Sequence, residues 1–329
     1  MSITTAPSEA ARARARARRR LQRNDRIGER VLRALCLAAA AVTVVTIVAI
    51  AWQVIHGASA AISKTGVGFL VHSAWKPNFD VFGATVMLYG TVVSSTMALL
   101  LALPIGIAVG LYLSLLAPRG VRGVVGPLVE MLAAIPSVIL GFWGIVVLGP
   151  FLQAHVEPWL HSTLGFLPIF GPPGTTGASI FTAGLILTIM VVPIIASISR
   201  DLFQTVPRDL KDGAEALGAT RWEVVRGVVL PSTASGIAAA ACLGLGRALG
   251  EAIAVTQVIG AATAVNVNLF GTGATLASQI ANQFQSPVSS LHTSAMFYLA
   301  VLLLAIGLVT NLLAQWIGRR FDVRRVVAA

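Results

Sequence analysis

Long runs of mostly apolar residues with few or no charges divide this chain and predict membrane-spanning helices. At 1.5 Å of rise per residue, about 20 residues cross a hydrocarbon core of roughly 30 Å. The runs cover Ala34–Ile55, Val81–Pro118, Val124–Leu152, Ile180–Ser199, Val228–Ala262 and Ala295–Gly318. The pattern therefore predicts an all-α, polytopic membrane protein with six transmembrane helices.

The first run is longer than the core of a secretory signal peptide. Ala34–Ile55 holds no charge, whereas signal-peptide cores have roughly 7 to 15 apolar residues. We interpret it as a retained transmembrane helix. The small residues Ala58, Ser59 and Ala60 resemble a cleavage site, so removal of the segment stays an alternative.

Charge distribution decides how the long second run is counted. If Val81–Pro118 is one helix and the amino terminus is inside, basic residues concentrate in the inner segments and the outer loops hold only Lys64 and Lys76. Splitting the run in two would place the basic loop after Ser199 outside, against the positive-inside rule. We therefore expect one long helix, bent or loosened near Pro104, with both termini cytoplasmic.

Composition excludes the soluble classes. Of 329 residues, 56% are hydrophobic and 11% are charged, against roughly 25% charged in a soluble domain. Disordered and collagen-like chains are excluded as well. The two cysteines, Cys36 and Cys242, lie in separate apolar runs, so neither a disulfide framework nor a cysteine metal site is expected.

The net charge of +11 is local, because ten of the 24 Lys and Arg residues lie between Arg12 and Arg33. We interpret this tract as a disordered basic arm held at anionic lipid headgroups, with nucleic-acid binding as the alternative. The expected organisation is a basic cytoplasmic arm (1–33), a first transmembrane helix (34–55), an outer loop (56–81), a five-helix core (82–318) containing a cytoplasmic loop (200–231), and a basic cytoplasmic tail (319–329).

Signatures of catalysis are absent from the sequence. No phosphate-binding loop of the G-x-x-x-x-G-K-[ST] type, no G-x-S-x-G elbow and no H-E-x-x-H motif occurs. His155 and His161 with Glu157 form a weak candidate metal set, for which a solvated loop is the favoured interpretation. We expect no catalytic residue, no metal site and no cofactor, so uphill transport would need a partner or an ion gradient.

Small residues and prolines inside the runs predict close helix packing around a wet interior. Gly106 with Gly110, and Gly246 with Gly250, have the G-x-x-x-G spacing that allows backbones to approach. Prolines within the runs free carbonyls that neighbouring helices or water must satisfy. These prolines are Pro104, Pro136 and Pro193.

One expected cytoplasmic segment, 200–226, carries ten charges in 27 residues. Pro207 is placed to open a helix that breaks at Gly218. Thr220 then caps a second helix, with Glu223 at the spacing of a capping box. The result is an elbow of two short helices that protrudes from the membrane surface and fits the groove of a partner.

This elbow resembles the E-A-A-x3-G-x9-I-x-L-P loop of bacterial ABC-importer permeases. The matching positions are Asp212, Gly213 and Ala214 for E-A-A, Gly218 for the glycine, and Val228, Leu230 and Pro231 for the final motif. Glycine in place of the first alanine weakens the helix by up to about 1 kcal/mol. The resemblance implies that the elbow docks on an ATPase subunit.

Three ionisable residues lie inside the expected spans: Glu130, Arg247 and Glu251. Each costs about 2.5 to 3.5 kcal/mol at mid-bilayer and needs a partner or water, so all three are candidates for a substrate path. Arg247 and Glu251 are four residues apart and can pair on one helix face. In the alternative, the span ends at Gly246 and both charges are exposed outside.

An arginine on a hydrated path suits an oxyanion, and a nearby carboxylate prevents the arginine from trapping it. Two segments resemble phosphate-specific permeases of the PstC type: Leu243–Val255, which contains the G-R-A-x-G-E motif, and Leu132–Gly144. The resemblance extends over most of residues 30–320. The resemblance implies a type I ABC-importer permease fold with an extra amino-terminal helix, in the plasma (inner) membrane.

The same resemblance implies the partners and the cargo. They are a second, PstA-like permease, a PstB-like ATPase dimer, a PstS-like phosphate-binding protein and inorganic phosphate. Three alternatives stay open: a permease for molybdate or sulfate, the sister PstA-type subunit, and a membrane regulator that senses phosphate without passing it.

Overall fold

A computed structural model describes residues 9–262 and 264–320, with side chains described from 28 to 316 except at 263. Helices dominate this part of the chain, and the one β interaction described is an isolated bridge between Lys76 and Val81. The chain divides into two units, residues 1–56 and 57–329. We describe each unit by itself.

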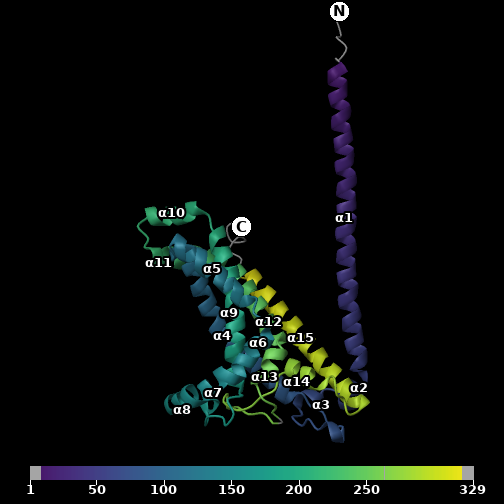
Figure 1. Ribbon diagram of the computed structural model, residues 1–329, viewed down its shortest axis with the longest axis vertical. Helices are drawn as coiled ribbons and strands as arrows, with labels where there is room; N and C mark the ends of the chain where they lie inside the picture. The colour runs from purple at the N-terminus through teal and green to yellow at the C-terminus, as the bar shows by residue number, and fades with distance from the viewer. Residues whose placement is uncertain (1–8, 263, 321–329) are drawn as a thin grey trace, which may run out of the picture. The chain divides into compact units, whose positions relative to one another are not determined.

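The first unit is a single helix, α1 (Glu9–Gly57) (Figure 1). Its candidate spanning part is Gly28–Gly57, which contains the expected first span. The helix begins at Glu9, so the expectation of disorder is wrong for the described part of the basic arm. Alanine and arginine, which alternate there, are both strong helix formers. Residues 1–8 of the arm and 321–329 of the tail lie outside the described residues.

The expectation of six membrane spans is confirmed. Six helices among the described residues are long and apolar enough to cross a membrane. They are Gly28–Gly57, Thr85–Leu116, Ser137–Leu164, Ile180–Thr205, Arg221–Gly250 and Ser290–Trp316.

The second unit contains the other elements of the fold (Figure 1). In chain order the principal helices are α2 (Ser59–Thr65), α3 (Gly68–Val71), α4 (Thr85–Leu111), α5 (Arg119–Ala133), α6 (Ser137–Trp143), α7 (Gly149–Phe151), α8 (Glu157–Leu164), α9 (Ile180–Thr205), α10 (Arg208–Ala216), α11 (Arg221–Val224), α12 (Leu230–Gly250), α13 (Ile253–Val258), α14 (Leu276–Gln283) and α15 (Ser290–Arg320). Wider π-helical turns extend or join several of them: η2 (Tyr112–Leu116), η3 (Gly144–Leu148), η4 (Leu152–Val156) and η6 (Val225–Val229). Short 3-10 turns are η1 (Pro77–Phe79) and η5 (Pro168–Phe170).

Helix α9 forms the centre of the second unit, and α4 packs closely along it. In its most apolar stretch, α9 is 72% buried, more than any other candidate span. A Cβ added at Gly106 would lie 2.8 Å from Ile195 Cβ, and one at Gly110 would lie 2.9 Å from Ser199 Cβ. The first G-x-x-x-G pair is therefore a true helix contact. A Cβ added at Gly246 or Gly250 would instead lie in open space, with no atom of the described chain outside the local helix within 4 Å.

The long second helix is confirmed, because α4 contains Pro104 and continues through η2 to Leu116. The expected third span is wrong in its bounds. Helix α5 ends at Ala133, and the spanning helix begins only at Ser137. Pro136 has an extended ψ of 132° and no N–H, which separates the two helices.

The expected fifth span is also too long. Helix α12 ends at Gly250, and Glu251 adopts an extended conformation with ψ of 113°. The short α13 follows, and it ends at Val258. The uncharged residues up to Ala262 thus continue as a turn, a short helix and a loop rather than as one transmembrane helix.

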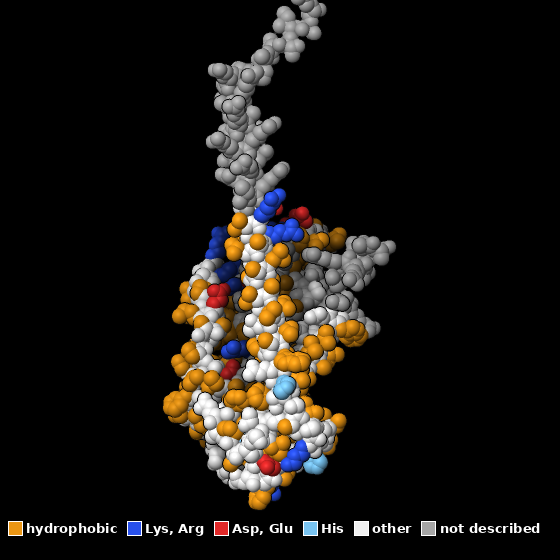
Figure 2. All heavy atoms as spheres, turned by 90° about the vertical axis from the view of Figure 1, so that its right-hand side faces the viewer, with side chains coloured by type: hydrophobic (Ala, Val, Ile, Leu, Met, Phe, Trp, Pro, Cys, Tyr) orange, Lys and Arg blue, Asp and Glu red, His pale blue; other side chains and the backbone are white. Residues whose placement is uncertain are grey.

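Short helices lie at two opposite ends of the second unit. In Figure 1, α10 and α11 lie at one end, and α3 and α8 lie at the other. Figure 2 shows hydrophobic side chains spread along the described face while charged ones are few. Such a surface is typical of helices that contact lipid.

Candidate functional site

Arg247 and Glu251 form an ion pair where α12 ends. Arg247 Nη2 lies 3.6 Å from Glu251 Oε2, and the two residues are four apart in sequence. The arginine side chain is 47% exposed, whereas that of the glutamate is 7% exposed. The carboxylate is thus buried behind the guanidinium, and the guanidinium keeps an open side.

Glu251 also fixes the turn that follows the helix. Its Oε1 accepts a hydrogen bond from the Ala254 backbone N–H at 3.3 Å, in the first turn of α13. One oxygen of the Glu251 carboxylate therefore accepts a backbone hydrogen bond, and the other forms the ion pair with Arg247. This second role explains why the side chain stays buried while its partner reaches outward.

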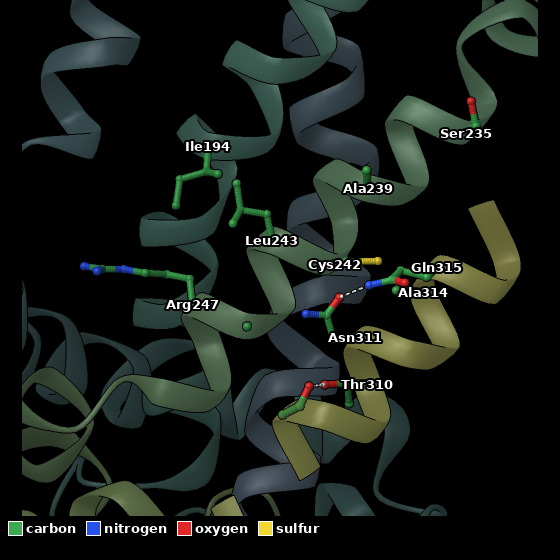
Figure 3. A pocket seen from close by; sticks show the side chains of 12 residues that line it. Ile194, Ser235, Ala239, Cys242, Leu243, Arg247, Thr310, Asn311, Ala314 and Gln315 are labelled. Atoms are coloured by element: carbon green, nitrogen blue, oxygen red, sulfur yellow. Dashed lines mark hydrogen bonds between the residues drawn. The ribbon is translucent and has the colours of Figure 1, made fainter. Parts of the chain in front are cut away.

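Arg247 is one of the residues that line a cavity of about 740 Å³ along one face of α12. The other walls come from α9 and α15. The lining residues are Ile194, Ser235, Ala239, Cys242, Leu243, Gly246, Arg247, Gly307, Thr310, Asn311, Ala314 and Gln315. In Figure 3, Arg247 extends from α12 on the side of Ile194, whereas Asn311 and Gln315 approach α12 from α15 on the other side. Arg247 is the one charged group in this lining.

A second, smaller cavity of about 140 Å³ also contains Arg247. Its apolar walls come from the α5–α6 junction and from α9. They are formed by Leu132, Ala133, Ile135, Leu140, Met190 and Ile194. The α5–α6 break at Pro136 thus contributes directly to the environment of the guanidinium.

This arrangement is suited to an anion that passes rather than stays. A guanidinium has five N–H donors in a planar fork, and the single oxygen of Glu251 occupies only part of that fork. The paired carboxylate compensates the charge of Arg247 when no anion is present. The alternative in which Arg247 and Glu251 are both exposed outside is wrong, because the side chain of Glu251 is buried.

Glu130, the third expected path residue, is not part of this site. It lies on α5, outside the six candidate spans, and it lines neither cavity at Arg247. Its carboxylate accepts a hydrogen bond from Arg200 Nη2 at 2.9 Å. Of the three ionisable residues chosen from the sequence, the structure brings only Arg247 and Glu251 together.

A buried carboxyl group lies at Glu157, where the sequence favoured a solvated loop. The residue is 0% exposed, and its Oε2 accepts the Gly174 N–H at 3.1 Å. Oε1 has no hydrogen-bond partner in the described chain. The third span was expected to end at Leu152, but the helix runs to Leu164 and includes Glu157. The apolar Trp159 and Leu160 beyond the charge were the available signal.

The weak metal set has no support in the geometry. His155 Nδ1 interacts with the Phe151 carbonyl oxygen, and His161 Nδ1 interacts with that of Phe170. Among the described residues, no group of three or more His, Cys, Asp or Glu side chains is placed to hold a metal ion.

The elbow at the α10–α11 end has the expected local structure. Helix α10 follows Pro207, and Gly218 adopts a φ of +86°, which permits the sharp turn. Thr220 and Glu223 form the capping box that begins α11. Leu217, at the tip, is 91% exposed.

The motif residues take distinct places around the elbow. Asp212 and Gly213 are exposed on α10, whereas Ala214 packs against the cluster around Phe203. Leu230 and Pro231 form the first turn of α12. Burial, together with repulsion from Arg208, lowers the pKa of Lys211, whose Nζ lies 3.3 Å from the Phe203 carbonyl oxygen.

Comparison with known proteins gives consistent matches. Residues 102–323 match the family model described as "Binding-protein-dependent transport system inner membrane component". The phosphate transport system permease protein PstC of Mesorhizobium japonicum is 41% identical over 89% of this chain and 91% of its own length. PstC of Pasteurella multocida is 41% identical over 83% and 86%, and PstC 2 of Mycobacterium tuberculosis is 38% identical over 84% and 89%.

Solved structures agree on the fold. A chain of a bacterial alginate ABC transporter, in complex with an alginate-bound periplasmic protein, has a TM-score of 0.60 and 17% identity, covering 88% of this chain and 95% of its own. A chain of the MetNI methionine ABC transporter in an inward-facing conformation has a TM-score of 0.52 and 21% identity, covering 72% and 96%. The helix arrangement is thus that of ABC-importer permeases.

Proposed function

Because the chain belongs to the binding-protein-dependent transport system inner membrane components, and within them to the PstC-type permeases, we propose that it forms the translocation path for inorganic phosphate in an ATP-driven importer. It is a multi-pass inner-membrane subunit. The observation that carries the proposal is the half-exposed Arg247, paired with the buried Glu251, in a cavity that otherwise has no charged lining.

In this proposal phosphate passes Arg247 between this subunit and a second, PstA-like permease. The guanidinium supplies charge-assisted hydrogen bonds to the phosphate oxygens. Glu251 competes for the same guanidinium, so the anion is not held too tightly for release. Open space at Gly246 and Gly250 leaves the cavity face of α12 free for the second permease.

Energy comes from a PstB-like ATPase dimer that hydrolyses ATP, while this chain performs no catalysis. The ATPase contacts the elbow around Leu217 and Gly218, and motif residues Asp212, Gly213, Ala214, Leu230 and Pro231 connect that contact to α12. This assigns the α10–α11 end, both termini, the basic arm (1–33) and the tail (319–329) to the cytoplasm. A PstS-like protein delivers phosphate at the opposite face.

The test is reconstitution of the assembled complex. This chain, expressed with its neighbouring subunits, is purified through a tag and examined for a second permease and an ATPase. The complex in lipid vesicles, with the binding protein supplied, should accumulate labelled phosphate only with ATP. Sulfate and molybdate at tenfold excess should leave uptake unchanged.

Two results would contradict this function. Strong competition by sulfate or molybdate would indicate a permease for a different oxyanion. ATP hydrolysis by a complete complex without any accumulation of anion would instead favour a regulator that senses phosphate.

A further inference from the structure

A partly exposed ion pair joins α9 to α5 in the second unit. Arg200 Nη2 lies 2.9 Å from Glu130 Oε1, and the two residues are 70 positions apart in sequence. The Arg200 side chain is 19% exposed, so its guanidinium is held mostly under its neighbours, whereas that of Glu130 is 53% exposed. This contact joins the two helices directly through charged side chains.

Helix α5 leaves room for the arginine. A Cβ added at Gly126, one helical turn before Glu130, would lie 3.3 Å from Arg200 Nη1. The guanidinium therefore rests on the α5 backbone at Gly126 and reaches Glu130 on the same helix face. A Cβ at Gly126 would require the guanidinium to shift by a few tenths of an ångström, and the larger side chain of valine would crowd it further. The pair is thus fitted into α5 rather than formed by two freely moving surface groups.

Arg200 lies near the elbow, and Glu130 lies near the cavity that contains Arg247. Arg200 lies in the last turns of α9, which ends at Thr205 before α10 and the elbow begin. Glu130 lies two residues before Leu132, which lines the smaller cavity together with Arg247. A movement of the elbow that shifts the end of α9 would therefore also shift Glu130, and with it the α5 part of the wall beside Arg247, through this contact.

Arg200 has a second acidic partner that provides a natural comparison. Asp201 Oδ1 accepts hydrogen bonds from Arg200 Nε at 3.2 Å and from Nη2 at 3.1 Å. Asp201 is the adjacent residue on α9, so this contact connects no other helix. The two carboxylates share one guanidinium, but only Glu130 links α9 to α5.

We propose that Arg200 and Glu130 are positioning residues for coupling, which transmit movement of the ATPase-docking elbow to the cavity wall at Arg247. The inference rests on the proposed function. A role in folding alone is an insufficient explanation, because ion pairs with one well-exposed partner contribute little to stability. Loss of the Arg200–Glu130 contact should uncouple the elbow from the cavity wall at Arg247, while the protein still folds.

The first experiment measures phosphate imported per ATP hydrolysed by the assembled complex in vesicles. Glu130→Gln and Gly126→Val should lower this ratio at least fivefold, with the amount of complex and the rate of ATP hydrolysis within twofold of wild type. Asp201→Asn is the matched control and should keep the wild-type ratio. The charge exchange Glu130→Arg with Arg200→Glu should restore at least half of it. A wild-type ratio in Glu130→Gln, or no recovery in the exchanged pair, would overturn the inference.

A second measurement does not depend on the cargo. In a Cys36→Ser background, Cys242 in the larger cavity is modified by a water-soluble thiol reagent with and without ATP. ATP should change the modification rate several-fold in wild type and in Asp201→Asn, and should leave it unchanged in Glu130→Gln. An equal effect of ATP in Glu130→Gln would refute the coupling role. Wild-type vesicles that accumulate no phosphate would refute the proposed function instead.

Discussion

The guanidinium of Arg247 stands 3.6 Å from the carboxylate of Glu251, and only the arginine is open to the cavity. This difference in exposure distinguishes the pair from an ordinary structural or surface ion pair. A buried pair with both groups enclosed would be a structural contact, and a pair with both groups exposed would be a surface contact. Here only the cation lines the cavity and its counter-charge is buried, and under the proposed function this lets an anion bind for a short time and leave.

Glu251→Gln should slow transport by strengthening the hold on the anion. Glutamine keeps an oxygen that can accept the Ala254 N–H, so the turn after α12 is preserved, but it removes the negative charge. An uncompensated guanidinium in a low-dielectric path attracts phosphate more strongly and releases it more slowly. We expect the maximal uptake rate to fall several-fold and labelled phosphate to remain longer on the purified complex. Unchanged uptake and retention would argue against a balancing role for Glu251.

Cys242 should react with reagents that enter only through water. It lines the same cavity as Arg247, so in a Cys36→Ser background a charged, membrane-impermeant methanethiosulfonate should modify it and reduce phosphate uptake at least tenfold. The Cys36→Ser, Cys242→Ser variant is the control and should be insensitive. Reaction with lipid-soluble reagents alone would place this face of α12 against lipid.

Gly218→Val should disturb coupling without unfolding the transmembrane core. The φ of +86° at this position costs a side-chain-bearing residue roughly 1 to 2 kcal/mol, so the tip of the elbow must rearrange. Phosphate imported per ATP should fall several-fold. Gly227→Ala is the control, because Gly227 is an exposed helical residue of η6, a Cβ there would meet no atom of the described chain outside its own helix within 4 Å, and alanine favours the helix. Equal coupling in both variants would remove the special role of the elbow.

Gly106→Val should destabilise the packing of α4 on α9. A Cβ at this site would approach Ile195 Cβ to 2.8 Å and the Ala196 backbone nitrogen to 3.2 Å, so the helices must separate. Overpacking of this kind typically costs about 1 to 3 kcal/mol. The yield of monodisperse protein and its thermal unfolding midpoint should both fall. Gly123→Ala, on α5 with no atom of the described chain within 4 Å, should leave both unchanged.

Sequence reasoning succeeded where a feature depends on local chemistry. Hydrophobic runs located six spans because length and apolarity alone determine a membrane helix. Thr220 and Glu223 predicted the capping box because the contact closes within one helical turn. The proximity of Arg247 and Glu251 followed from their i, i+4 spacing, whereas the exposure of one and burial of the other did not.

The sequence failed where an apolar run hides a break in the backbone. At Pro136 and at Glu251 the chain leaves the helix between residues that continue the hydrophobic pattern. At Glu251 the side-chain carboxylate accepts the Ala254 N–H and stabilises the turn, a contact that leaves no mark in the hydrophobic pattern. The ends of the third and fifth spans were wrong for this reason.

Contacts between residues far apart in sequence could not be predicted either. Glu130 was assigned to the substrate path because it lay in an apolar run, but its partner Arg200 is 70 residues away. Glu157 was placed in an outer segment because a charge ended the expected span. The placement of Glu130 inside a span and the early end of the third span are wrong because each charge was judged by its neighbours in sequence rather than in space.

The most direct test of the central claim is ATP-dependent uptake of labelled phosphate by vesicles that contain the complex with Arg247→Ala. Each charge-assisted hydrogen bond lost contributes about 1.5 to 3 kcal/mol, which corresponds to a reduction of roughly tenfold to a hundredfold. The variant complex should assemble in wild-type amounts and import phosphate at less than a tenth of the wild-type rate. Import at the wild-type rate would contradict the assignment of Arg247 to the phosphate path.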